Sequence, residues 1–186
     1  MQIKLTDETI LLRPFREEDI VPVHEAIIES FNELSKWMRW CNEDYTFEDT
    51  AAFVRSRDDA WKNEIDYSFA VFDRATEVFQ ASVGLSFVNR TYQMANLGYW
   101  VRTSATRKGI ASRATRLLAR FAFEELKLQR VEIVAAVENV ASQLVAERAG
   151  AVREGIMRKR LISDHRATDA VMYSLVAEDL DLSSRS

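Results

Sequence analysis

One segment limits the possible folds of this chain more than any other part, the stretch from residue 97 to residue 137. It begins with a strand-like run at 97–101 and continues into a short polar loop that ends near Gly109. Apolar residues then recur at helical spacing up to Leu126, and an apolar-rich run follows at 130–137. A strand, a helix and a second strand in this order predict a central β-α-β unit.

The loop and the helix of this unit are basic, although the chain as a whole is acidic. The net charge is −4 at pH 7, yet residues 102–120 hold six Arg or Lys residues and no acid. The first turn of a helix leaves backbone N–H groups unpaired, and a glycine before it lets an anion approach the backbone. Residues 96–111 therefore predict a polyphosphate site. The alternative is an ordinary helix start with a solvated basic face.

Length and composition favour one domain over residues 1–186, with 47% hydrophobic and 29% charged residues. No apolar run approaches the roughly 20 residues that span a bilayer, and the N-terminus lacks the pattern of a signal peptide. One cysteine, Cys41, and two histidines, His24 and His165, leave little for a disulfide, a metal site or a Ser-His-Asp triad. We expect a cytoplasmic protein without metal, membrane contact or nucleic-acid partner.

The remaining pattern predicts an α+β fold, not a doubly wound Rossmann fold. Helices are expected at 17–30, 46–63, 110–126 and 140–149, with a short helix or turn at 33–40. Strands are expected at 3–13, 67–72, 78–88, 93–101, 130–137, 151–162 and 168–176, the last two as a hairpin around His165. Thr46 and Asp49 form a candidate capping box, while Asn139 and Gly150 are placed to cap the helix at 140–149.

Three motifs together resemble the GNAT-superfamily N-acetyltransferases, specifically the RimJ/RimL type that acetylates protein N-termini. The motifs are L-R-P-F-R-E-E-D at 12–19, L-G-Y-W-V at 97–101, and the segment from Asn139 to Glu154-Gly155. The likeness covers roughly residues 8–178. It implies a mixed, mostly antiparallel sheet of about seven strands, flanked by helices, whose β-α-β unit binds acetyl-CoA. It also implies acetyl transfer to a primary amine by direct attack in a ternary complex.

The resemblance assigns roles to individual residues. The cofactor's pyrophosphate would rest on backbone N–H groups of 106–111, and its pantetheine arm on the end of the strand 97–101, where that strand splays from 130–137. A strand-end N–H would polarise the thioester carbonyl. Ser142 would protonate the leaving thiolate. The expected cofactor-binding residues are Trp100, Val101, Arg102, Thr106, Arg107, Lys108, Gly109, Ile110, Ala111 and Asn139.

Departures from the family pattern concern the acid and the base. Many superfamily members have a Tyr acid at the position of Ala146, which has no hydroxyl. The resemblance to the RimJ/RimL type, which has Ser at the position of Ser142, implies that Ser142 is the acid instead. Asn96 and Leu161 stand where relatives carry acidic residues that act as the base. No residue has a clear claim to the role of base, and a water chain to solvent is one route for the proton of the amine.

Several alternatives stay open at this point. The acceptor is a protein N-terminus, as on a ribosomal protein, or else a polyamine, an amino acid or an antibiotic amine. A non-catalytic acyl-CoA-binding domain is the rival to an enzyme, and both monomer and homodimer are compatible with the sequence. Trp37 and Trp40 are expected to pack in the core, with an acceptor groove as the alternative. The acidic residues Glu29, Glu33, Glu43 and Asp44 would either attract a cationic amine or form solvated surface.

Overall fold

A computed structural model describes residues 3–163 and 166–181 of the chain. These residues form one eight-stranded sheet in the order β1-β2-β3-β4-β5-β6-β8-β7. Its strands are β1 (Leu5–Thr6), β2 (Ile10–Pro14), β3 (Tyr67–Asp73), β4 (Phe79–Asn89), β5 (Met94–Val101), β6 (Arg130–Ala136), β7 (Val152–Ser163) and β8 (Arg166–Leu175). Only β5 and β6 pair in parallel. The predicted α+β fold is confirmed, and the β-prone segments expected within 3–13 form the short strands β1 and β2.

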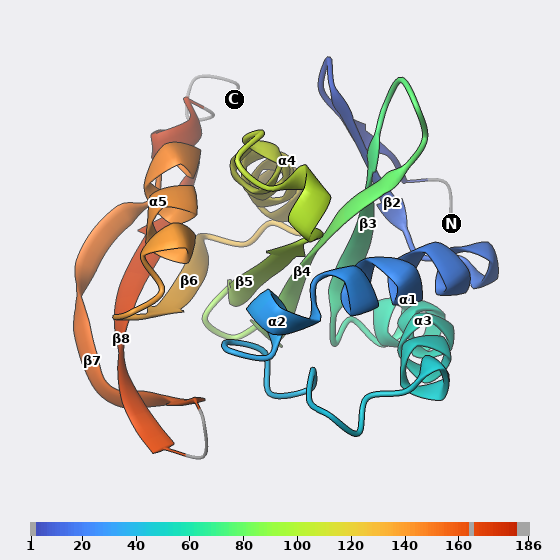
Figure 1. Ribbon diagram of the computed structural model, residues 1–186. Coiled ribbons are helices and arrows are strands. Elements are labelled where there is room, and N and C mark those ends of the chain that lie inside the picture. Colours follow the sequence, from blue (N-terminus) through green and yellow to red (C-terminus); the bar gives the residue numbers. More distant parts are fainter. Residues whose placement is uncertain (1–2, 164–165, 182–186) are drawn as a thin grey trace.

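Helices cover both faces of the sheet (Figure 1). They are α1 (Ile20–Glu29), α2 (Phe31–Leu34), α3 (Phe47–Lys62), α4 (Ile110–Glu124) and α5 (Val140–Ala149), with 3-10 turns η1 (Glu17–Asp19), η2 (Thr103–Ala105) and η3 (Ala177–Leu180). The helix expected at 17–30 is therefore a 3-10 turn followed by α1. The closing hairpin is confirmed, whereas His165 lies outside the described residues.

Two hydrophobic cores lie on opposite faces of the sheet, because successive side chains of a strand point to opposite sides. On one face, Phe69 of β3 packs with Leu118 and Phe121 of α4. On the other face, Phe72 of the same strand packs in a cluster with Val23 of α1. The core on the α4 face is thus shared by β2 to β6 and β8 and also contains Trp61 of α3, whereas the core on the other face is formed mainly with α1 and α3.

The predicted helix caps are all present. The backbone N–H of Asp49 donates to Thr46 Oγ1 at 3.3 Å, and the N–H of Thr46 donates to the Asp49 carboxylate at 2.8 Å. Asn139 Oδ1 accepts from the N–H of Ser142 at 3.1 Å, and Gly150 ends α5 with φ 95°. Local sequence signals were sufficient at these helix ends.

Two of the sequence motifs have structural roles. Within the 12–19 motif, the buried Asp19 carboxylate accepts two hydrogen bonds of 2.7 Å from the guanidinium of Arg13, which ties β2 to the start of α1. The 139–155 motif ends in Glu154, which pairs with Arg130 of β6 at 2.6 and 2.7 Å and accepts from Ser174 of β8 at 2.7 Å. These contacts hold three neighbouring strands in register.

Among the described residues, no helix has the length and apolar character that a membrane span requires.

Candidate active site

A cleft divides the sheet between its two parallel strands. Pairing of β5 with β6 ends at Asn96 and Glu132, although β5 continues to Val101 and β6 to Ala136. Beyond the last pair lies a cavity of about 230 Å³, here called the cleft. It is lined by Trp37, Met38, Asn96, Leu97, Gly98, Tyr99, Ile133, Val134, Ala135, Ala136, Asn139, Ser142, Leu161 and Ile162.

Backbone direction decides which groups of β5 face the cleft. Residues of an antiparallel strand alternate in pointing their N–H and C=O toward a given partner. The N–H of Arg102 donates to Gln80 O of the segment that forms β4. By this alternation, Trp100 also directs its backbone groups to β4, while those of Tyr99 and Val101 face the side from which β6 has separated. An extended chain in the cleft can therefore pair with Tyr99 and Val101.

The loop between β5 and α4 presents a row of backbone donors. Thr106 donates its N–H to Thr103 O, and Arg113 donates its N–H to Gly109 O. Within the described part of the chain, no backbone carbonyl accepts from the N–H groups of residues 107–112. Unpaired donors at a helix start attract an anion, so residues 107–112 are suited to a phosphate group.

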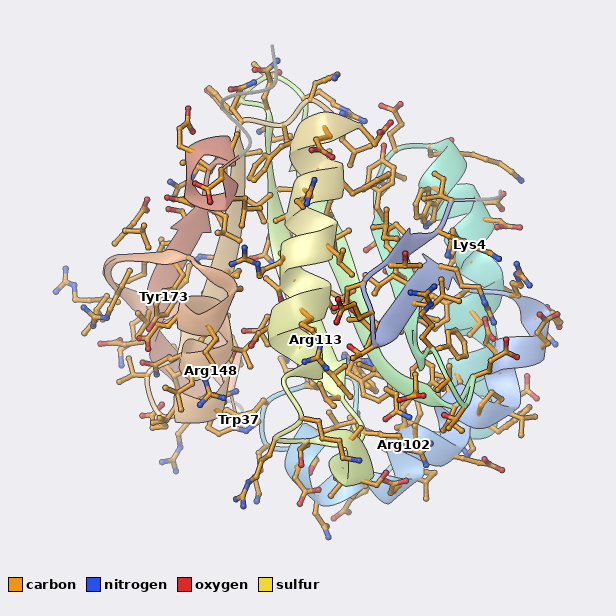
Figure 2. The ribbon with its side chains drawn as sticks, turned by 90° about the horizontal axis from the view of Figure 1, so that it is seen from above. Lys4, Trp37, Arg102, Arg113, Arg148 and Tyr173 are labelled. Carbon is orange, nitrogen blue, oxygen red and sulfur yellow. The ribbon has the colours of Figure 1, made fainter. Side chains whose placement is uncertain are left out.

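Left-handed backbone and one arginine hold this loop in shape. Arg107 has φ 61° and Gly109 has φ 74°. Arg113, from the first turn of α4, donates to Lys108 O at 3.0 Å, and its Nε lies 3.4 Å from the Asp7 carboxylate. A Cβ on Gly109 would lie 3.1 Å from Arg113 Nη1, so the glycine supplies both conformation and space. Figure 2 shows Arg102 and Arg113 near the end of α4 where this loop enters the helix.

Residues from α1 and α2 clamp the η2 turn that leads into the loop. The Glu29 carboxylate accepts from the guanidinium of Arg102 and, at 2.8 Å, from the N–H of Ser104. These hydrogen bonds lower the pKa of Glu29 to about 2. Ser30 Oγ accepts from the N–H of Thr103 at 2.9 Å. The side chain of Arg102 is thus paired with Glu29, and Glu29 holds the η2 turn although its side chain is 30% exposed.

Ser142 lies on the far wall of the cleft, opposite β5. The hydroxyl of Tyr99 donates to Ser142 O at 2.8 Å and lies 3.1 Å from Ser142 Oγ. Burial raises the pKa of Tyr99 to about 12, so this hydroxyl stays protonated at neutral pH. The two side chains bridge the walls of the cleft, and they place a hydroxyl pair beside the backbone that faces it.

A second and larger cavity adjoins the cleft. It measures about 600 Å³ and lies between α1, α3 and the sheet. Gly98, Tyr99 and Met38 line both spaces, so the two meet at the middle of β5. We call this space the large cavity. It is lined by Val23, Ile27, Met38, Trp40, Asn42, Asp44, Tyr45, Asp49, Phe53, Asp66, Ser68, Ser82, Gly84, Ser86, Gly98, Tyr99 and Trp100.

The expectation that Trp37 and Trp40 pack in the core is wrong. Trp37 is 37% exposed and lines the cleft, whereas Trp40 is 42% exposed and lines the large cavity. The physical reason is that α2 ends at Leu34, so both indoles stand on irregular chain that runs over the cavities instead of on a buried helix face. Figure 2 shows Trp37 on the side of the cleft that faces α5.

The remaining residues considered in the sequence analysis, His24, Cys41, Asn96 and Leu161, lie in two kinds of environment: the first two pack within the fold, and the last two line the cleft. His24 Nδ1 lies 3.0 Å from the hydroxyl of the buried Thr50. Cys41 is buried, and burial raises the pKa of its thiol. Asn96 and Leu161 both line the cleft.

Comparison with known proteins settles the family. An acetyltransferase (GNAT) domain model matches residues 9–152. The chain belongs to the GNAT acetyltransferase family. This GNAT protein is 33% identical over 176 residues to YdaF of Bacillus subtilis (strain 168), provisionally named a ribosomal N-acetyltransferase; the match covers 93% of this chain and 94% of YdaF.

Solved structures agree with the fold of this GNAT protein. A crystal structure titled as a probable acetyltransferase has a TM-score of 0.86 at 26% identity, covering 96% of this chain and 99% of that one. RimL, a ribosomal L7/L12 alpha-N-protein acetyltransferase solved with coenzyme A, has a TM-score of 0.85 at 20% identity, covering 94% and 98%. The protein is therefore an acetyl-CoA-dependent N-acetyltransferase, and the enzyme interpretation is favoured over a non-catalytic domain.

Two features of the site were not predicted from the sequence: the contact of Tyr99 with Ser142 and the clamp formed by Glu29. Tyr99 stood inside the L-G-Y-W-V motif, but its contact with Ser142 joins residues 43 positions apart. The Glu29 clamp joins residues 73 positions apart. Neither contact has a local signal, since helical or strand periodicity reports only on neighbours in the chain.

Proposed function

We propose that this acetyltransferase transfers the acetyl group of acetyl-CoA to the N-terminal amine of a protein, of the ribosomal-protein type, with residues 1–186 acting as one domain. The observation that carries the proposal is the junction of two spaces at Gly98 and Tyr99. One space lies along β5, the strand that leads into the loop with the phosphate donors, and the other is large enough for the end of a peptide. The name given to YdaF supports a ribosomal acceptor, and such an acceptor indicates a cytoplasmic enzyme.

The N–H groups of residues 107–112 would hold the cofactor's pyrophosphate, because they are unpaired and lie at a helix start. Side chains of Thr106, Arg107 and Lys108 are exposed beside them and add positive charge. The backbone of Val101 and Tyr99 would pair with the extended arm. Asn139 lines the cleft, and its side-chain oxygen already accepts from the N–H of Ser142 at the start of α5. Asn139 would therefore shape the wall of the cleft, and this oxygen would not bind the cofactor.

When bound, acetyl-CoA supplies an activated thioester. The N–H of Tyr99, which faces the cleft, would donate to the carbonyl oxygen and stabilise the charge that develops there. The amine nitrogen bonds to the carbonyl carbon, the carbon–sulfur bond breaks, and Ser142 Oγ gives a proton to the sulfur. The hydroxyl of Tyr99 donates to the backbone oxygen of Ser142 and so positions this serine. The serine then regains a proton from solvent.

The proton lost by the amine needs a different route. Asn96 cannot accept it at neutral pH, and Leu161 has no polar atom. A protein N-terminal amine has a pKa near 8, so part of it is already neutral under physiological conditions. Water in the large cavity would carry the remaining proton to solvent, which makes a strong base unnecessary.

The test follows free thiol released from acetyl-CoA with peptides that copy ribosomal-protein N-termini. Ser142→Ala should lower kcat about 100-fold while leaving the KM for acetyl-CoA unchanged, as expected for a lost proton donor. Ser56→Ala, on the exposed surface of α3, is the matched control and should behave as wild type. Wild-type turnover by Ser142→Ala would show that the proton comes from another group.

A further inference from the structure

Small residues at matched positions of three strands form the floor of the large cavity. Strand register places Ser68, Gly84 and Gly98 side by side across β3, β4 and β5. A Cβ on Gly84 would lie 2.9 Å from Ser68 Oγ, so nothing larger than glycine fits there without a shift. Because these residues are small, no side chain from this part of the sheet fills the cavity, and a ligand has room there.

The charges that line the large cavity have one sign. Asp44, Asp49 and Asp66 line it, and none of its lining residues is Arg, Lys or His. Asp66 is balanced by Arg57, whose Nη1 lies 3.1 Å from the carboxylate. Asp49 caps α3, and the hydrogen bonds from Thr46 lower the pKa of its carboxyl group. Two negative charges, on Asp44 and Asp49, therefore lack a cation in the wall.

Aromatic rings connect the reacting end of the large cavity with these carboxylates. The ring of Trp100 on β5 lies 6.3 Å from that of Trp40, which in turn lies 5.4 Å from that of Tyr45. Tyr45 follows Asp44 directly in the chain. Faces of such rings attract cations, most strongly when water is excluded. A cationic side chain that extends from Gly98 toward Asp44 and Asp49 can therefore contact aromatic faces along its length.

One polar group on the floor of the cavity lacks a partner. Ser82 is 7% exposed and lines the cavity, yet its hydroxyl has no hydrogen-bond partner among residues 3–163 and 166–181. This hydroxyl faces the cavity, and its hydrogen-bonding capacity is free for a ligand donor or a water. It gives the cavity a polar contact that is independent of the carboxylates.

We infer that the large cavity binds a cationic side chain of the acceptor, close in sequence to the reacting amine; this inference rests on the proposed function. The reacting amine itself does not account for the carboxylates. That amine must be neutral when it attacks near Gly98, and an adjacent carboxylate would stabilise its protonated form. The carboxylates at the other end of the ring row serve a second positive charge. The acceptor class is a peptide whose second or third residue is Lys or Arg.

The experiment compares three peptides that share the same N-terminal serine and differ only in their second residue, which is Lys, norleucine or Glu. Norleucine has the length of Lys without its charge. For the wild-type enzyme, kcat/KM should be about tenfold higher with the Lys peptide than with the norleucine peptide, and lowest with Glu. The difference should lie in KM and should shrink with added salt.

Two variants test the carboxylates. Asp44→Asn, which caps no helix, should reduce the preference for Lys over norleucine severalfold, through a higher KM for the Lys peptide. Asp58→Asn, an exposed residue of α3 outside the cavity, is the matched control and should retain the full preference. Tryptophan fluorescence of the CoA-bound protein gives a second readout that does not need turnover, because Trp40 and Trp100 line the cavity.

Each outcome has one meaning. Equal kcat/KM for the Lys and norleucine peptides, with both acetylated, overturns the inference and leaves the proposed function intact. Acetylation of a diamine, with no peptide acetylated, overturns the protein acceptor but supports a cation site. Fluorescence titrations in which the Lys peptide binds no tighter than the Glu peptide overturn the inference whatever the rates.

Discussion

Glu29→Gln is the perturbation that most directly tests how the cofactor loop is held. The glutamate belongs to α1, on the acceptor side of the sheet, but its carboxylate holds η2 through Arg102 and the N–H of Ser104. Glutamine keeps the size and one acceptor oxygen while it removes the charge. The variant therefore isolates the ionic part of the clamp.

The magnitude follows from the pKa of Glu29, which the clamp lowers from 4.5 to about 2. Fully shielded from water, that change would correspond to about 3 kcal/mol. The Glu29 side chain is 30% exposed, and solvent screening reduces such pairs strongly. We expect Glu29→Gln to lose about 1–2 kcal/mol of unfolding free energy. Where this free energy is lost from the loop conformation that binds cofactor, that conformation becomes less populated and the KM for acetyl-CoA rises about tenfold.

The pH dependence of the clamp has a defined sign. The folded-state pKa of Glu29 is lowered, so the stabilisation is complete above its ordinary value of 4.5 and is lost as pH falls toward 2. Urea unfolding of wild type and Glu29→Gln should therefore differ at pH 7 and converge as the pH falls from about 4.5 toward 2. Glu25→Gln, an exposed change on the same helix, is the control. A stability difference that is the same at every pH would refute an ionic clamp.

Three further predictions concern the loop, the cleft and the sheet. Gly109→Ala should lose about 1–2 kcal/mol in thermal unfolding and weaken CoA binding by calorimetry, because φ is 74° there; unchanged affinity would count against the loop. Tyr99→Phe should lower kcat through Ser142, and wild-type kcat should show no ionisation of this tyrosine below about pH 11, since its pKa is raised to about 12. Glu154→Gln should destabilise the protein by about 1 kcal/mol without changing KM, because its partner Arg130 lies outside the cleft; an altered KM would contradict a purely structural pair.

Local patterns in the sequence were enough to predict the β-α-β unit and the helix ends. Gly109, Asn139 and Gly150 occupy positions where only a few residue types fit, so their roles could be assigned without a structure. Hydrophobic periodicity likewise placed α4 and β6 within a few residues of their observed limits. The predicted separation of the two parallel strands is also present.

Contacts between distant segments could not be predicted in this way. The exposure of Trp37 and Trp40 depends on how early α2 ends and on the open space below it, which no periodicity encodes. The roles of Glu29 and Tyr99 depend on partners brought together only by the tertiary fold. The L-R-P-F-R-E-E-D and Glu154-Gly155 motifs identified the family, while their charged residues serve the structure of the sheet.

A crystal structure with coenzyme A bound tests the central claim most directly, because it locates the cofactor against named atoms. We predict that the pyrophosphate accepts from backbone N–H groups of residues 107–112 and that the sulfur lies within hydrogen-bond reach of Ser142 Oγ, inside the cleft between β5 and β6. A cofactor bound elsewhere, or a sulfur remote from Ser142, would contradict the account.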